Sequence, residues 1–333
     1  MRATRKLSKP PLALGAALSV LLLAAPAGAV LSPVRLLARY QPVQVLHPDE
    51  AFRPVAVGGF LQTALLEQRT AVGWVPGGRP SRLPDQDPPD CTSTPSQRCW
   101  RLRQPGCTAS TGVSSVACYA ALAAAQQSAN VVYGAVHRSG RRIALQYWYW
   151  YLDDFWSGEY PPSDYVWQAH EGDWEVVTVI LTRAGRPLLA GYSEHGCGKR
   201  RPWARVPKLG RTHPLVYVAL GSHANYFAPG PHPLDLSPAC YPPLGAAILR
   251  SYLPQVLDRT ARGPMLGPAA VRIMPITGAA PQWMRFPGGW GEANFFHAPA
   301  PVGTTVAGPA PEGPARHAIW REPVRTVLAW PRG

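Results

Sequence analysis

Proline is the residue that most limits how this chain can fold. Its 333 residues include 39 Pro and 31 Gly. Because proline lacks a backbone donor and interrupts the interior of helices, long helical bundles and coiled coils are excluded. The 12 Trp, 13 Tyr and 7 Phe supply more buriable aromatic surface than a disordered chain carries. The composition therefore predicts a folded, loop-rich protein dominated by β-structure.

The first 29 residues have the layout of a secretory signal peptide. A basic start leads into an apolar stretch over residues 12–25 and a small-residue cleavage site, Ala27-Gly28-Ala29. Removing this segment lowers the net charge from +14 to +10, because it holds four basic residues and no acidic one. No later segment is long enough to span a membrane. We expect a secreted, extracellular protein without a transmembrane span after cleavage; an uncleaved N-terminal anchor is the alternative.

All six cysteines follow the predicted signal segment. An even number of cysteines in an oxidising compartment predicts disulfide bonds. Their spacing favours a cluster of four between residues 91 and 118 and a separate pair, and the absence of C-x-x-C argues against a zinc ribbon or a thioredoxin-type site. The disulfide candidates are Cys91, Cys99, Cys107, Cys118, Cys197 and Cys240.

The order of the apolar runs predicts one globular unit whose core is a two-sheet β-sandwich. Residues 131–333 are expected to form this core, with a Pro/Gly-rich C-terminal stretch and a last strand over 318–329. Residues 30–130 should supply an N-terminal arm, long disulfide-stapled loops and a helix over 113–128, and a further peripheral helix is expected over 244–251. The strands are expected from β-branched and aromatic runs at Val131–His137, Ile143–Tyr151, Trp174–Thr182, Leu188–Ser193 and Leu215–Leu220.

An acidic segment precedes one of these strands. In His170-Glu171-Gly172-Asp173-Trp174-Glu175, period-two alternation places Asp173 and Glu175 on the face that carries Val177. Two carboxylates at the mouth of a core need a cation or a shared proton. Carboxylates with one imidazole suit Mg²⁺ or Ca²⁺ better than Zn²⁺. We therefore predict a divalent metal site with His170, Asp173 and Glu175 as ligands.

Other residues are expected to complete or line this site. A further ligand could come from Asp153 or Asp154, which follow the aromatic strand Gln146–Tyr151. His195, Glu194 and His223 end or follow predicted strands, so they could lie at the same pole. The alternative is that the acids pair with arginines or cap turns. The chain lacks G-x-S-x-G, which argues against a serine hydrolase and leaves open whether the protein is an enzyme.

An ordered series of short motifs resembles the vacuolar protein sorting-associated protein 62 family. The similarity covers about residues 131–297 and implies little chemistry, because that family's activity is poorly defined. It rests on Leu145-Gln146-Tyr147-Trp148-Tyr149-Trp150-Tyr151, the segment from His170 to Glu175, Tyr192-Ser193-Glu194-His195-Gly196, the stretch from His213 to Phe227, and Phe286-Pro287-Gly288-Gly289-Trp290-Gly291.

A more distant resemblance concerns the necrosis- and ethylene-inducing peptide-like (NPP1-type) proteins. Those cytolysins carry a Gly-His-Arg-His-Asp-Trp-Glu heptapeptide on a β-sandwich, where it helps to hold a divalent cation used to engage sphingolipid head groups. His170, Asp173 and Glu175 match that motif position for position, whereas its leading Gly and second His have no counterpart here. In that family another Asp comes from a loop after an aromatic strand, near the positions of Asp153 and Asp154.

The excess of basic residues favours an anionic partner such as an anionic lipid, a glycan or a cell-surface polymer. Nothing resembles a nucleic-acid-binding module, so no nucleic-acid partner is expected. The sequence is compatible with three alternative functions. The favoured one is a metal-containing sandwich that binds an anionic or glycosylated surface or a lipid head group. The others are a metal-dependent hydrolase and an acid cluster or metal with a purely structural role.

Overall fold

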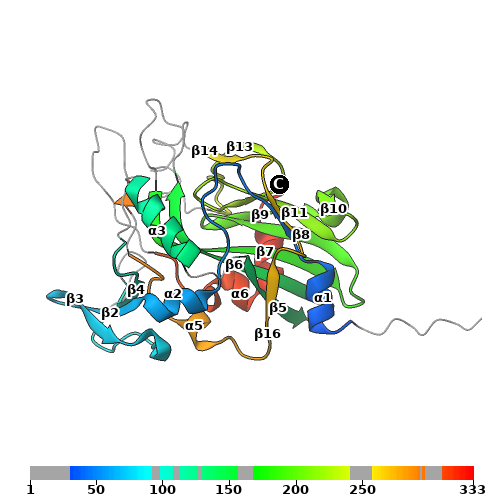
Figure 1. Cartoon of the computed structure of the whole chain (residues 1–333). Coiled ribbons are helices and arrows are strands. Elements are labelled where there is room, and N and C mark those ends of the chain that lie inside the picture. Colours follow the sequence, from blue (N-terminus) through cyan, green and yellow to red (C-terminus); the bar gives the residue numbers. More distant parts are fainter. Residues whose placement is uncertain are drawn as a thin grey trace, which may run out of the picture. The chain divides into compact units, whose positions relative to one another are not determined.

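The computed structural model describes residues 31–91, 98–107, 113–125, 130–156, 168–240, 257–292, 295–296 and 310–333. Strands dominate these residues, and two sheets enclose a common core, so the predicted fold class is confirmed (Figure 1). The larger sheet has the order β16-β5-β6-β7-β8-β9, with β17 beside β7. Its strands are β5 (Val131–Ser139), β6 (Arg142–Trp156), β7 (Gln168–Thr182), β8 (Pro187–Glu194), β9 (Cys197–Pro202), β16 (Arg272–Ile276) and β17 (Phe295–Phe296).

The second sheet has the order β10-β11-β1-β15, and β12 pairs with β11. Strand β1 comes from the expected N-terminal arm and runs parallel to β11. The division of the chain at residue 130 stays a prediction, although the arm supplies a strand to this sheet. The strands are β1 (Val43–Val45), β10 (Lys208–Leu209), β11 (His213–Val218), β12 (Asn225–Tyr226) and β15 (Met265–Leu266), with the hairpin β13 (Gly230–Pro233) and β14 (Leu257–Thr260) outside both sheets.

Strand β6 is buried on both faces because each face carries large aromatic side chains, tyrosines on one and tryptophans on the other. Tyr147, Tyr149 and Tyr151 lie in the core between the two sheets, together with Val216 and Val218 of β11. On the other face, Trp148 and Trp150 join a second core. Strand β7 divides in the same way, with Val177, Val179 and Leu181 in the first core and Trp174, Val176 and Ile180 in the second. The alternation read from the sequence is therefore confirmed.

A small sheet and helices α2, α6 and α7 cover the outer face of the larger sheet, whereas α1 and α3 contribute Leu36, Leu37 and Tyr119 to the core between the two sheets. The small sheet has the order β3-β2-β4 and gathers with α2 and α5 at one end of the molecule (Figure 1). Helix α1 lies near β5 and β16, and α3 packs near β6. The bounds are α1 (Pro33–Arg39), α2 (Val57–Thr63), α3 (Val113–Ala125), α5 (Gln282–Arg285), α6 (Ala318–Arg321), α7 (Pro323–Ala329), β2 (Leu65–Thr70), β3 (Gly73–Gly78) and β4 (Trp100–Arg103), with 3₁₀ turns at Pro80–Arg82, Trp203–Arg205 and Pro314–Arg316.

The expected last strand over 318–329 is wrong, because this segment forms α6 and α7. Pro323 begins α7 at a position where a missing backbone donor costs nothing. Val327 and Trp330 then pack on glycines of the sheet. A Cβ at Gly191 would lie 2.6 Å from Val327 Cγ1, so the bare backbone makes room for the helix. The expected helix over 113–128 is found as α3, whereas the signal segment and the helix over 244–251 lie outside the described residues.

Three disulfide bonds join all six cysteines. They are Cys91–Cys99, Cys107–Cys118 and Cys197–Cys240. The separate C-terminal pair is therefore confirmed, and within the cluster of four each cysteine pairs with its sequence neighbour. Among the described residues, no helix is both long enough and apolar enough to cross a membrane.

Candidate metal centre

Strands β6 and β7 carry the acidic residues at the end where their regular alternation stops. Asp154 lies opposite His170, and Tyr151 lies opposite Asp173. Strict alternation along β7 would turn His170 and Asp173 to opposite faces. Gly172, which lies between them, has a φ of 70°. This left-handed conformation redirects the chain and brings both side chains to one side.

Only glycine fits at this turn. A Cβ at Gly172 would lie 2.2 Å from Trp150 Cη2 and 2.3 Å from the carbonyl oxygen of Trp290. The carbonyl of Gly172 also lies 2.7 Å from His170 Nδ1, which fixes the imidazole with its Nε2 toward Asp154. The packing of the second core and the geometry of the acidic site thus depend on the same residue.

Asp154, His170 and Asp173 form a group that could hold a metal ion. One ligand atom from each lies within 4.8 Å of the others, and His170 Nε2 is 2.9 Å from Asp154 Oδ2. All three residues are buried. Asp154 Oδ1 has no hydrogen-bond partner in the described part of the chain. Because buried carboxylate oxygens almost always have partners, this oxygen and the donor set fit a divalent cation.

His223 supports Asp173 from the opposite side. Its Nδ1 lies 3.1 Å from Asp173 Oδ2, and its Nε2 faces Glu50 Oε1 at 3.5 Å. The imidazole stacks on Tyr151 at a centroid distance of 3.8 Å. His223 also has a φ of 53°, an uncommon value for a non-glycine residue that clusters at functional sites. The fold therefore holds Asp173 through a fully buried and strained histidine.

The imidazoles supply the positive charge of the metal-free site. Burial alone would lower the pKa of His170, but Asp154 and Asp173 raise it to about 9. Burial likewise opposes the charged form of His223, whereas Glu50 and Asp173 raise its pKa to about 10. Burial raises the pKa of Asp154 despite the opposing effect of His170. Without a cation, the site is thus stabilised by bound protons that a metal ion can replace.

The structure places the predicted ligands Glu175 and Asp153 outside this group. Glu175 accepts hydrogen bonds from the Ser193 hydroxyl and from Asn225 Nδ2, the latter at 3.0 Å. Burial, reinforced by Asp173, raises the pKa of Glu175 well above its usual value. Asp153 lies opposite Glu171 instead of opposite His170. Of the two alternatives for a further ligand, Asp154 is the one that reaches the histidine.

His195 and Glu194 belong to a neighbouring polar cluster. His195 Nε2 lies 2.6 Å from Asp258 Oδ2, and the hydroxyls of Ser222 and Tyr226 also donate to Asp258. His195 has a φ of 52° and packs against Trp156. Glu194 pairs with Lys199 at 3.3 Å.

Sequence reasoning missed several residues of both clusters. Asn225 lies within the motif from His213 to Phe227, so that motif could have pointed to it. Glu50 and Asp258 stand in unrelated segments and carried no signal in the sequence.

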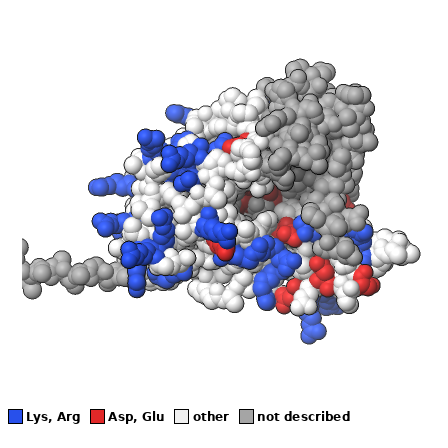
Figure 2. All heavy atoms as spheres, turned by 180° about the vertical axis from the view of Figure 1, so that it is seen from behind, with Lys and Arg blue, Asp and Glu red and all other residues white. Residues whose placement is uncertain are grey.

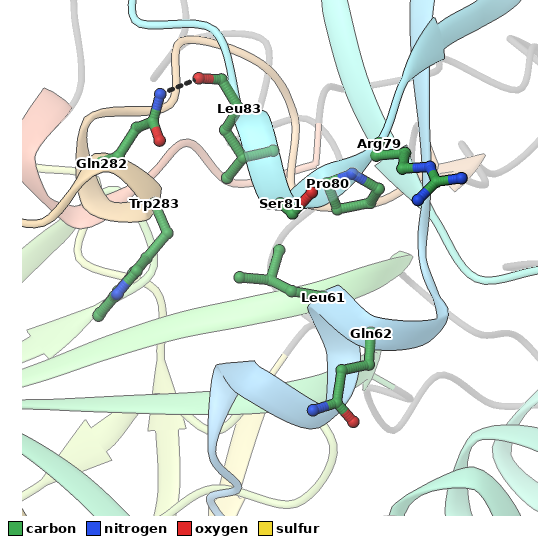
Figure 3. A pocket seen from close by; sticks show the side chains of 8 residues that line it. All are labelled: Leu61, Gln62, Arg79, Pro80, Ser81, Leu83, Gln282 and Trp283. Atoms are coloured by element: carbon green, nitrogen blue, oxygen red, sulfur yellow. Dashed lines mark hydrogen bonds between the residues drawn. The ribbon is translucent and has the colours of Figure 1, made fainter.

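A cavity of about 420 Å³ lies away from these clusters. It opens between α2, the 3₁₀ turn at Pro80–Arg82 and α5, and Gln282 closes one side by donating to the carbonyl of Leu83 (Figure 3). The described residues of its lining include no acid and no histidine, so it shares no described residue with the candidate metal centre. The residues that line it are Leu61, Gln62, Arg79, Pro80, Ser81, Leu83, Gln282 and Trp283.

Comparisons with known proteins agree with both resemblances seen in the motifs. No family model matches the chain. Vacuolar protein sorting-associated protein 62 of Saccharomyces cerevisiae is 26% identical over 176 residues, which cover 45% of this chain and 34% of that protein. The putative vacuolar protein sorting-associated protein TDA6 of the same yeast is 25% identical over 182 residues, which cover 44% and 36%. The chain thus spans about a third of the length of these two relatives.

Solved structures of necrosis- and ethylene-inducing peptide-like proteins correspond to the second resemblance. A protein described as a toxin fold for microbial attack and plant defense is 16% identical, with a TM-score of 0.31, over 62% of this chain and 74% of that chain. NLPPya in complex with mannosamine has the same identity and coverage and a TM-score of 0.32. Necrosis and Ethylene inducing Protein 2 from the causal agent of cocoa's Witches Broom disease is 16% identical, with a TM-score of 0.28, over 58% and 67%.

Proposed function

We propose that Asp154, His170 and Asp173 hold a divalent cation, and that the protein uses this site to bind an anionic or glycosylated surface such as a lipid head group. The observation that carries the proposal is the convergence of three buried ligand atoms within 4.8 Å. Two carboxylates and one imidazole favour Mg²⁺ or Ca²⁺. When bound, the cation neutralises the acids and offers coordination positions to ligand oxygens.

The surface charge supports an anionic partner. Lys and Arg side chains predominate on the left of the face shown in Figure 2, whereas Asp and Glu gather at its lower right. The sequence without its first 29 residues has a net charge of +10. Such a surface attracts anions over about 10 Å at moderate ionic strength. Three disulfide bonds and no free cysteine among the described residues fit our proposal that the protein works outside the cytosol.

We expect cation-dependent retention on anionic vesicles. Vesicles that contain an anionic phospholipid should sediment with the protein in Mg²⁺ or Ca²⁺, and chelation should reduce the retained fraction about tenfold because the cation bridges protein and ligand oxygens. Vesicles or resins that display neutral glycans form a second arm and distinguish a sugar from an anionic head group. Retention that chelator leaves unchanged in both arms contradicts the proposed function.

Metal binding should release a proton. The pKa of His170 is about 9 in the metal-free protein, so the imidazole is protonated at pH 7 and must lose its proton before Nε2 can bind a metal. The apparent affinity should therefore rise about tenfold per pH unit between pH 7 and pH 9 and then level off. Calorimetric titrations in buffers with different ionisation enthalpies measure the number of protons released. An affinity that does not change over this range excludes His170 as a ligand.

The second candidate function is a metal-dependent hydrolase, favoured by the contact of His195 with Asp258. An ionised Asp258 that also accepts from Ser222 and Tyr226 can orient the imidazole for proton transfer. In this case ester or glycoside substrates should be turned over only with the cation. Both Asp173→Ala and His195→Gln should then lower the rate about 100-fold or more. Turnover that survives either replacement argues against this function.

A further inference from the structure

A second pair of acids lies on β6 and β7, next to the candidate metal centre. Asp153 is directly opposite Glu171, and their exposed fractions are 1% and 0%. Directly opposed residues of antiparallel strands share a face, with Cβ atoms about 4.5–5.5 Å apart. Two carboxylates buried at this spacing repel each other unless a positive charge or a proton lies between them. The negative charge of the pair therefore needs a positive charge or a proton. The neighbouring residues Asp154 and His170 form no hydrogen bond to Asp153.

The nearby arginine, Arg103, forms its ion pairs with other acids. Arg103 donates to Glu67 and lies 3.7 Å from Glu292. Neither carboxylate oxygen of Asp153 has a hydrogen-bond partner in the ranges that the structure describes. Arginine pairing, the usual reason for a buried acid, is therefore not found for Asp153 within those ranges.

The same region contains a third buried oxygen that lacks a hydrogen-bond partner among the described residues. The hydroxyl of Tyr119 in α3 is buried and likewise has no partner among the described residues. The Cys107–Cys118 bridge next to Tyr119 joins α3 to the segment whose Gln104 backbone amide donates to Glu171, and α3 packs near β6, so the phenol and the two acids belong to one region of the core. In keeping with this, burial raises the pKa of Tyr119, and the charges of Glu171 and Asp153 raise it further. Three buried oxygen-bearing side chains thus lie in one region, and two of them, Asp153 and Tyr119, have no hydrogen-bond partner among the described residues.

Glu171 is fixed in position by the backbone of two distant segments. Its Oε1 accepts from the Gln104 amide at 2.7 Å, and its Oε2 accepts from the Glu292 amide at 3.1 Å. The Cys107–Cys118 bridge ties the segment of Gln104 to the helix that carries Tyr119. The cluster therefore connects the disulfide-stapled region to the central strands.

We propose that Asp153, Glu171 and the Tyr119 hydroxyl form a second cation site, distinct from the group of Asp154, His170 and Asp173. Its donors are all oxygen atoms, so it selects a hard divalent cation, Ca²⁺ or Mg²⁺. The ion fills the unpartnered oxygens, neutralises the acid pair and fastens α3 and the stapled loops to β6 and β7.

Counting bound ions tests this site. The mature, disulfide-bonded protein is dialysed against Ca²⁺ alone and, separately, Mg²⁺ alone. With the better-bound of the two ions, wild type should bind two per chain, Asp173→Asn one, Asp153→Asn one and the double variant none. An Asp153→Asn variant that binds as many ions as wild type overturns the proposal. An unchanged count for Asp173→Asn overturns the first site instead, so the two failures are distinguishable.

Thermal unfolding in the Asp173→Asn background gives a second readout that does not depend on counting. The cation should raise the Tm of Asp173→Asn, because it binds the folded chain at the second site. This rise should vanish when Asp153→Asn is added and shrink when Tyr119→Phe is added. In chelator, Asp153→Asn should be at least as stable as its parent, since it removes a buried acid whose oxygens have no hydrogen-bond partner among the described residues. An equal cation-induced rise in all three variants contradicts the second site.

Discussion

Replacing Asp173 with Asn should lower the affinity for divalent cations by at least about 100-fold. Asp173 is one of the three ligand residues that we propose, and the replacement removes its negative charge while keeping an oxygen that can accept from His223. The fold should persist, because the side chain keeps its volume and its histidine contact. Calorimetric titration with Mg²⁺ and Ca²⁺ measures the affinity, and circular dichroism checks the fold.

A matched control is available on the surface. The Asp49 side chain is 79% exposed, so Asp49→Asn makes the same chemical change away from the core. It should leave the affinity within about twofold of wild type. Equal losses for Asp49→Asn and Asp173→Asn would mean that net charge governs cation binding, and the assigned site would be wrong.

Gly172→Ala should be the most destabilising single change in the site. A left-handed backbone costs a non-glycine residue about 1–2 kcal/mol, and overpacking a core adds about 1–3 kcal/mol. The new Cβ would meet Trp150 and the backbone of Trp290, neither of which can move freely. We expect the free energy of unfolding to fall by about 4 kcal/mol, measured by chemical denaturation, and cation binding to be lost as His170 is displaced.

Gly140→Ala separates the two contributions to this loss. Gly140 has a φ of 55°, but nothing lies within 4 Å of a Cβ built there. It should therefore cost only the backbone strain, about 1–2 kcal/mol, and leave cation binding unchanged. If the two alanine variants lose the same stability, the close packing around Gly172 has no energetic role.

The sandwich core could be predicted because its signals are local. Alternating residues of β6 and β7 show which side chains face which core, and period two needs no knowledge of distant segments. The C-terminal helices were missed for the opposite reason. Ile319, Val327 and Trp330 have a strand-like composition, and the glycines that accommodate α7 and Trp330, Gly191 and Gly198, lie more than a hundred residues earlier.

The grouping of residues at the candidate metal centre could be read from the sequence only in part, and the missing part is geometric. The motif identified His170 and Asp173 but not the turn at Gly172 that brings them to one side, because alternation assumes an unbroken strand. The motif also could not decide between Asp153 and Asp154 as the further ligand. The register between β6 and β7 determines which of them faces His170, and a motif within one strand does not contain that register. Glu50 supports the site through His223 from a separate segment, and such a contact exists only after folding.

The most direct test of the account is the metal content of the purified mature protein, measured by elemental mass spectrometry after exchange into metal-free buffer with and without added Mg²⁺ or Ca²⁺. The account predicts that wild type retains a divalent ion at the Asp154, His170 and Asp173 site and that Asp173→Asn has one ion fewer per chain. Wild-type protein that binds no divalent ion under saturating conditions, or a variant with the same content as wild type, would contradict it.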